Sequence, residues 1–129
     1  MVVLEINTPT REVMVDITDM VMQEIKKSGV VDGLCVIFVP HTTAGITINE
    51  NADPTVREDI MAALEKIIPN MRFKHMEGNS DAHIKASLMG SSVTLIIENG
   101  RPLLGTWQGI YLCEFDGPRR RRVYIKFLK

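Results

Sequence analysis

The last third of the chain alternates apolar and polar residues over three segments that are separated by strong turn signals. Residues 92–98, 106–115 and 123–129 alternate, with Asn99-Gly100 after the first segment and residues 116–118 (Asp-Gly-Pro) after the second. A period of two is typical of a strand with one buried face. Turns of this composition join antiparallel neighbours. We therefore expect the C-terminal third to form antiparallel sheet.

Three other segments have the periodicity of helices. Residues 17–28 carry apolar side chains three or four apart and stop at Gly29, a typical C-terminal signal. A second helix is predicted to begin at Asp53-Pro54, an N-cap acceptor followed by proline, and to end before Pro69. A third is predicted at residues 81–89. The predicted buried stripe of the second helix comprises Val56, Ile60, Ala63, Leu64 and Ile67.

The first half adds further strands. Residues 2–6 and 12–16 alternate, residues 34–39 form a continuous apolar run, and residues 42–49 are rich in Thr and Ile. The continuous run predicts a central strand that is covered on both faces. The chain has 129 residues without a linker or repeat. We expect one compact α+β domain over residues 1–129, with a mixed, largely antiparallel sheet packed against about three helices.

Composition excludes several kinds of partner. The formal net charge is −1, whereas proteins that bind nucleic acid usually carry a clear basic excess. No apolar run reaches the roughly 18 residues that a membrane span requires, and the N-terminus lacks the pattern of a signal peptide. The two cysteines lie in apolar segments, as buried free thiols do. We expect a cytoplasmic protein with neither a nucleic-acid nor a membrane partner.

The chain has three histidines, His41, His75 and His83, and each lies at the edge of a predicted element. Three neutral imidazoles can hold zinc and leave a position open, but the spacings match no short zinc motif, and three unrelated histidines are the alternative. Glu50 follows a predicted strand and could supply an oxygen ligand to Mg²⁺, whereas Asp53 has a sufficient role as a helix cap.

Two segments could bind phosphate. The helix that begins near Asn79 presents free N–H groups and the positive end of its dipole. Residues 119–122 are four consecutive arginines, and arginine binds phosphate oxygens in pairs. Alternation along the strand that follows would direct Arg119 and Arg121 to one side and the two other arginines to the opposite side.

These residues fall in four blocks that together resemble a known family. The blocks are residues 41–50 (HTTAGITINE), 75–90 (from His75 through GNSDAHIK to Gly90), 104–108 (LGTWQ) and 114–121 (EFDGPRRR). Their order and spacing are similar to those of the YjbQ-like family, also called the secondary thiamine-phosphate synthase family.

The resemblance implies an α+β homotrimer with pockets near the subunit interfaces and a histidine cluster that can hold a divalent metal ion, Mg²⁺ or Zn²⁺. It implies catalytic roles for His41, Glu50 and His83, and metal ligation by His41, His75 and His83. It also implies binding of a small phosphorylated metabolite by a second set of residues. These are Asn49, Asn79, Trp107, Gln108 and Arg119.

The activity implied by the resemblance belongs to thiamine biosynthesis. A transferase of this kind condenses hydroxymethylpyrimidine diphosphate with a thiazole phosphate and releases pyrophosphate. Two alternatives use the same groups: a metal-dependent phosphoester hydrolase, in which the site activates water, and a non-catalytic sensor of a phosphorylated metabolite.

Overall fold

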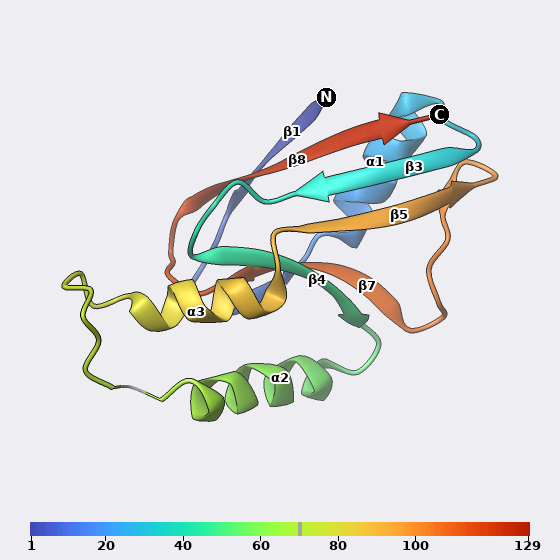
Figure 1. Ribbon diagram of the computed structural model, residues 1–129. Coiled ribbons are helices and arrows are strands. Elements are labelled where there is room, and N and C mark those ends of the chain that lie inside the picture. The colour runs from blue at the N-terminus through green and yellow to red at the C-terminus, as the bar shows by residue number, and fades with distance from the viewer. Residues whose placement is uncertain (70) are drawn as a thin grey trace.

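Within the part of the chain that the structure describes, the protein folds into two antiparallel sheets and three helices (Figure 1). The computed structural model describes residues 1–69 and 71–129. The strands are β1 (Val2–Asn7), β2 (Val13–Asp16), β3 (Gly33–Phe38), β4 (Ala44–Glu50), β5 (Ser92–Glu98), β6 (Arg101–Pro102), β7 (Gln108–Glu114) and β8 (Arg120–Leu128). The helices are α1 (Thr18–Ser28), α2 (Pro54–Ile67) and α3 (Ser80–Met89). The predicted α+β class is therefore confirmed, with two sheets in place of one.

The strand order separates a large sheet from a small one. The large sheet has the order β1-β8-β3-β5-β6 and the small sheet has the order β2-β7-β4. All the strand pairs of the described residues are antiparallel. The two termini lie together at one end of the large sheet, because β1 and β8 are antiparallel neighbours (Figure 1).

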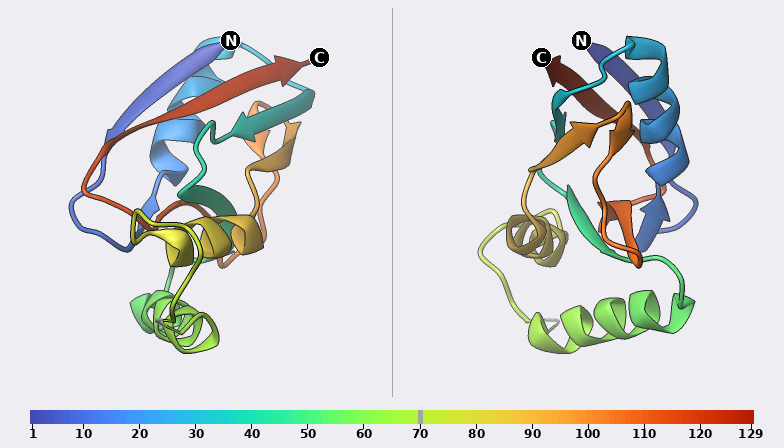
Figure 2. Two further views of the ribbon diagram at one scale, coloured as in Figure 1. Left: turned by 60° about the vertical axis from the view of Figure 1, so that its left-hand side comes forward. Right: turned by 90° about the vertical axis from the view of Figure 1, so that its right-hand side faces the viewer.

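Two apolar clusters hold the layers together. The main core joins α1, the inner face of the large sheet and one face of the small sheet, with Val21, Ile37 and Ile110 among its buried members. The second cluster lies on the other face of the small sheet, where α3 and Leu64 of α2 pack against it, with α2 outermost (Figure 2). Burial of this apolar surface is the main stabilising contribution to the fold.

The strand that is covered on both faces is β7 and not β3. Ile110 and Leu112 of β7 face the main core, while Tyr111 and Cys113 face the second cluster. In β3, Leu34 and Phe38 are 41% and 42% exposed, so one face of this strand is open in the isolated chain. The predicted central position of residues 34–39 is confirmed, because β3 is the middle strand of the large sheet. The predicted cover on both faces is not found in the isolated chain, because a continuous apolar run does not reveal whether its second face is covered.

The second helix also packs less completely than its sequence predicts. Its start is as expected, since Asp53 accepts a hydrogen bond from the N–H of Thr55 and Pro54 follows the cap. Among its described side chains only Leu64 is buried, while Ile67 is 64% exposed.

None of the helices that the described residues form is long and apolar enough to cross a membrane.

Candidate functional site

His41 lies beyond the end of β3 and is fixed by the neighbouring strand β8. Its Nε2 accepts a hydrogen bond from the backbone N–H of Arg122 at 2.9 Å. An accepting Nε2 requires the neutral ring with its proton on Nδ1. Burial lowers the pKa of His41, and the nearby positive charge of Arg121 lowers it further. His41 therefore offers an Nδ1–H donor near neutral pH.

Glu114 and Arg121 form a buried ion pair close to His41. Glu114, at the end of β7, is fully buried and binds Arg121 of β8 through both carboxylate oxygens. The Thr8 hydroxyl donates to the same carboxylate at 2.7 Å, and Arg121 also donates to the Thr43 hydroxyl at 2.9 Å. Burial alone would raise the pKa of Glu114, but these hydrogen bonds outweigh burial and hold it below its ordinary value.

A second polar group joins the start of α3 to the turn before β8. Asn79 donates from Nδ2 to Asp116 at 2.8 Å, and Arg119 donates from Nη2 to the same carboxylate oxygen at 3.0 Å. The Nε of Arg119 donates to the backbone oxygen of Asp116 at 2.8 Å. Within the described part of the chain, the buried Oδ1 of Asn79 accepts no hydrogen bond. An acceptor of this kind is available to a ligand.

These groups border one polar cavity of about 340 Å³, which we call the His41 cavity. It is lined by Pro40, His41, Thr42, Thr43, Glu77, Asn79, His83, Asp116, Arg119 and Arg121. Four of the residues predicted to act at the site, His41, Asn79, His83 and Arg119, therefore lie together although they are far apart in sequence. Arg121 and Arg119 reach the same cavity, as strand alternation predicts, while Arg120 and Arg122 are exposed elsewhere.

His75 and His83 border a second, more apolar cavity of about 460 Å³, the His75 cavity. Their rings are 5.5 Å apart and nearly perpendicular. Since His83 lines both cavities, the two adjoin at this side chain. Nδ1 of His75 lies 3.2 Å from Oγ of Ser80, and its Nε2 lies 3.7 Å from a carboxylate oxygen of Glu77.

The three histidines do not fit a shared metal ion in this arrangement. Over residues 1–69 and 71–129, no group of three His, Cys, Asp or Glu side chains is placed to hold one. Nε2 of His41 already accepts the Arg122 N–H, and both ring nitrogens of His75 face protein groups. The predicted ligation of a divalent metal by His41, His75 and His83 is not reproduced by the geometry.

The other predicted site residues lie at the opposite end of the small sheet. Glu50 ends β4, six residues and about 20 Å along the strand from Ala44 beside the His41 cavity. Asn49, Trp107 and Gln108 are its neighbours there, because Glu50 pairs with Gln108 and the Asn51 N–H donates to the Trp107 carbonyl. The structure therefore separates Glu50 from the histidines with which it was predicted to act.

Several residues of the site were not assigned a role from the sequence. Thr43, Asp116 and Arg121 line the His41 cavity, and Ser80 and Phe73 line the His75 cavity. The alternation of the arginine run placed Arg121 on the side of Arg119, but no local pattern reveals the contact between Arg121 and Thr43.

The two cysteines are not nucleophiles, because burial raises the pKa of Cys35 to about 11 and that of Cys113 to about 12.

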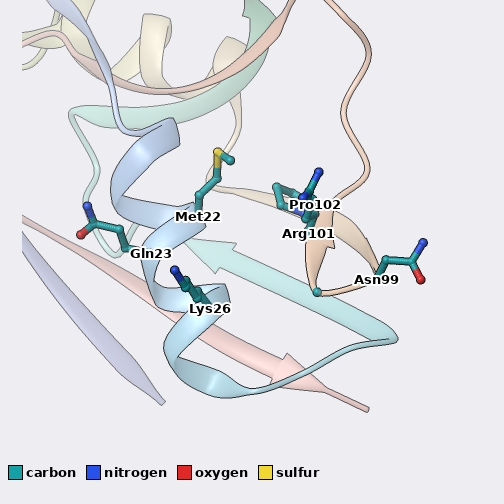
Figure 3. Close-up of a pocket in the computed structure, with 7 residues that line it drawn as sticks. Met22, Gln23, Lys26, Asn99, Arg101 and Pro102 are labelled. Atoms are coloured by element: carbon teal, nitrogen blue, oxygen red, sulfur yellow. The ribbon is translucent and has the colours of Figure 1, made fainter.

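A further cavity of about 450 Å³ lies away from the histidines, between α1 and the turn from β5 to β6. Met22 and Lys26 of α1 stand opposite Arg101 and Pro102 (Figure 3). It contains none of the predicted site residues.

Comparison with known proteins gives the family of the chain. The UPF0047 protein YjbQ-like family matches residues 2–129. The chain is 61% identical to a UPF0047 protein of Methanocaldococcus jannaschii over 125 residues, which are 96% of this chain and 91% of that protein. It is 51% identical to the UPF0047 protein YugU of Bacillus subtilis over 127 residues, covering 97% and 96% of the two chains.

Solved structures agree with the fold. A crystal structure of an uncharacterised YjbQ/UPF0047 protein from Clostridium acetobutylicum matches with a TM-score of 0.96 at 56% identity, covering 99% of this chain and all of that one. A conserved hypothetical protein from Thermus thermophilus matches with a TM-score of 0.92 at 45% identity, covering 99% and 100%. The chain belongs to the YjbQ-like (UPF0047) family.

The comparisons correct the predicted activity. The relatives are named only as UPF0047 proteins or as uncharacterised or hypothetical proteins, and none of these names states a thiamine-phosphate synthase activity. The described residues also lack the metal cluster on which that mechanism depended. The prediction of a metal-dependent thiamine-phosphate synthase was therefore wrong.

Proposed function

We propose that the His41 cavity binds the anionic group of a small phosphorylated molecule and that its histidines transfer protons to or from that molecule. The observation that carries this proposal is the meeting of Arg119, Asn79 and His83 in one polar cavity, with Asn79 at the N-cap of α3. Arg119 and the N-cap end of α3 favour a bound anion for separate physical reasons.

The start of α3 has donors available. Asn79 occupies the N-cap position but makes no side-chain cap hydrogen bond, because its amide is bound to Asp116 instead. The N–H groups of Ser80 and Asp81 precede the first intrahelical bonds, which reach the Asn79 carbonyl from Ala82 and His83. Uncapped donors at the positive end of a ten-residue helix favour an anion.

Arg119 supplies a pre-oriented cation. Asp116 holds its Nε and Nη2, which leaves Nη1 without a protein partner among the described residues. The carboxylate of Asp116 is engaged by Arg119 and Asn79, and these hydrogen bonds keep its pKa low although burial acts in the opposite direction. The guanidinium is therefore fixed in place before a ligand arrives, which lowers the entropic cost of binding.

The remaining groups select a ligand that also carries a hydrogen-bond donor. The buried Oδ1 of Asn79 accepts a hydrogen bond from a ligand hydroxyl or a protonated phosphate oxygen. The Nδ1–H of His41 can donate to a ligand oxygen, and the His83 imidazole at the other side of the cavity can accept or donate a proton. An enzymatic role for the site rests on these two histidines.

Calorimetric and NMR titration with inorganic phosphate and with pyrophosphate tests the binding proposal. We expect the Ser80 and Asp81 amide signals to shift on titration. Arg119→Gln should weaken binding about 10-fold or more, because a hydrogen bond to a charged group is worth about 1.5–3 kcal/mol. Arg120→Gln is the matched control, since Arg120 lies near Glu5 away from the cavity. Equal affinity in both variants would refute the proposal.

We also propose that the open face of the large sheet mediates self-association, the property predicted above as a homotrimer. Thr94, Val36 and Lys126 form the middle row of this face. Two other rows lie on either side of it, Ile96-Leu34-Leu128 and Phe38-Tyr124-Val3. We call these six residues the outer face. Five of them, all except Tyr124, are large apolar side chains that are more than 40% exposed. Exposed apolar rows of this kind are typical of a protein interface.

A further inference from the structure

We propose that Ser80, His75 and Glu77 form a nucleophilic triad beside the His75 cavity, which hydrolyses small carboxylic esters with an apolar acyl group. The proposal does not depend on phosphate binding in the His41 cavity. It rests on the contacts of three side chains and on the character of the cavity that they border.

The three side chains have the order of contacts that activates a serine. Oγ of Ser80 lies 3.2 Å from Nδ1 of His75, and Nε2 of His75 lies 3.7 Å from Oε1 of Glu77. If Nε2 carries the proton toward Glu77, Nδ1 is left as the base that accepts the serine proton. In chymotrypsin Nε2 accepts the serine proton and Nδ1–H faces the carboxylate, whereas here Nδ1 faces the serine and Nε2 faces the carboxylate. A triad is defined by its contacts and roles and not by which ring nitrogen makes each contact.

The local chain geometry brings the three residues together. Gly78 has φ +81°, a left-handed conformation that reverses the chain between Glu77 and the first residue of α3. Ser80 is that first residue, so its hydroxyl stands at the positive end of the helix dipole. An oxyanion that forms on a carbonyl attacked by Ser80 would develop next to the free N–H groups of this helix turn.

The His75 cavity suits an apolar acyl group. Its volume is about 460 Å³, and it is bordered by Phe73, His75, Ser80, His83, Ile84 and the Lys74 side chain. Ile84 is 37% exposed, so an apolar surface is available beside the serine. The His41 cavity, by contrast, is lined by hydroxyl groups, histidines and charged groups. The two cavities therefore differ in the chemistry that they accept, although His83 borders both.

The reaction needs no group beyond the triad, the ester and water. Oγ of Ser80 bonds to the ester carbonyl carbon, and its proton passes to Nδ1 of His75. The C–O bond to the alcohol then breaks, and the alcohol leaves with the proton from His75. Water adds to the acyl–serine through the same base, which releases the carboxylic acid and restores Ser80. Glu77 orients the ring and stabilises its charged form.

Two measurements on the full chain test the triad. The first is labelling by a fluorophosphonate probe, followed by intact mass and peptide mapping, and the second is hydrolysis of p-nitrophenyl butyrate. We expect the label on Ser80, and no label or ester turnover in Ser80→Ala. His75→Gln should slow both reactions about 100-fold or more, the usual contribution of a general base. All three side chains of the triad are at least partly exposed, so these variants should fold.

Ser87→Ala is the matched control. Its hydroxyl donates to the His83 carbonyl, about two turns beyond Ser80 on the exposed side of α3 and outside the triad. This variant should keep both the label and the turnover. Label on another residue, or turnover that persists in Ser80→Ala, would overturn the proposal. Phosphate affinity measured on the same variants reports separately on the His41 cavity.

Discussion

At the scale of single residues, the largest consequence follows from the burial of the charge on Glu114. Its carboxylate has no access to solvent and is balanced by Arg121 and by the Thr8 hydroxyl. Glu114→Gln removes the negative charge and leaves Arg121 buried without a counter-ion. We expect the free energy of unfolding to fall by about 3–5 kcal/mol in a urea titration. The exposed pair Glu5–Arg120 gives the control, because Glu5→Gln should cost less than about 1 kcal/mol.

The carboxylate of Glu114 should also make the free energy of unfolding depend on pH. Its pKa is lower in the folded chain than the value of about 4.3 expected when unfolded, so protonation favours unfolding. The stabilisation is complete above the unfolded pKa and is lost as the pH falls through the folded pKa. Wild type should therefore lose more stability than Glu114→Gln below about pH 4. Parallel pH profiles of the two proteins would contradict this account.

His41 gives a prediction about its protonation state. Because its pKa is lowered and Nε2 accepts the Arg122 N–H, the neutral ring with the proton on Nδ1 should dominate at pH 7. The ¹⁵N chemical shifts of the ring, recorded across a pH titration, distinguish this tautomer. A protonated Nε2 would show that the contact with Arg122 is absent in solution. A titration midpoint above about 6.5, the ordinary histidine value, would show that burial and Arg121 do not lower the pKa of His41.

Sequence reasoning identified part of the site for a clear reason. His41, Asn79, His83 and Arg119 each stand at the end of an element, and element ends meet in the folded chain. Glu50 also ends an element, but its strand runs away from the histidines, and direction in the sheet cannot be read from one segment. Ser80 was given no role from the sequence, because its contact with His75 depends on the path of the preceding loop.

At the scale of elements, the contact between β4 and α3 controls the position of the candidate site. A Cβ atom on Gly45 would lie 2.7 Å from the Gly90 carbonyl oxygen and 2.9 Å from Cβ of Met89. Gly45→Ala must therefore displace the end of α3 and should cost about 1–3 kcal/mol, as overpacking does. Because α3 carries Ser80 and His83, phosphate affinity should also fall.

Gly105→Ala is the control for Gly45→Ala. The free energy of unfolding of both variants is measured by thermal and urea unfolding. A Cβ atom on Gly105 would meet only the flexible Gln108 side chain, at 3.3 Å or more. We expect little change in stability. An equal loss in both variants would show that the close approach of β4 to α3 does not constrain the fold.

The elements themselves were largely predictable. The helices begin within one residue of the predicted positions, and Asp53 caps α2 as expected. Strand β8 begins at Arg120, three residues before the predicted start, because the arginines pair with β1 despite their charge. The two-residue strand β6 was missed, since a segment this short has no period.

At the scale of the whole molecule, the outer face of the large sheet sets the expected state of assembly. Light scattering should report a mass above the 14.5 kDa of one chain, with three chains predicted from the family resemblance. Leu34→Lys, at the centre of its apolar row, should lower that mass. Ile67→Lys is the control, because Ile67 is exposed on α2 outside the outer face. A monomer mass for wild type at micromolar concentration would refute self-association.

The division into two sheets was not predictable from local patterns. Strands that are neighbours in sequence, such as β3 and β4, belong to different sheets, and the sequence-distant pair β1–β8 closes the large sheet. The division of the strands between two sheets buries both faces of β7, one in the main core and one in the second cluster. Contacts of this kind join residues far apart in sequence, so no local pattern predicts them.

Anion binding in the His41 cavity can be tested in a crystal of the protein soaked with tungstate, an electron-dense analogue of phosphate. Binding in the His41 cavity predicts an anomalous peak within hydrogen-bond distance of Arg119 and the first N–H groups of α3, and its loss in Arg119→Gln crystals. An empty His41 cavity, with tungstate bound only at other basic side chains, would contradict the proposed function.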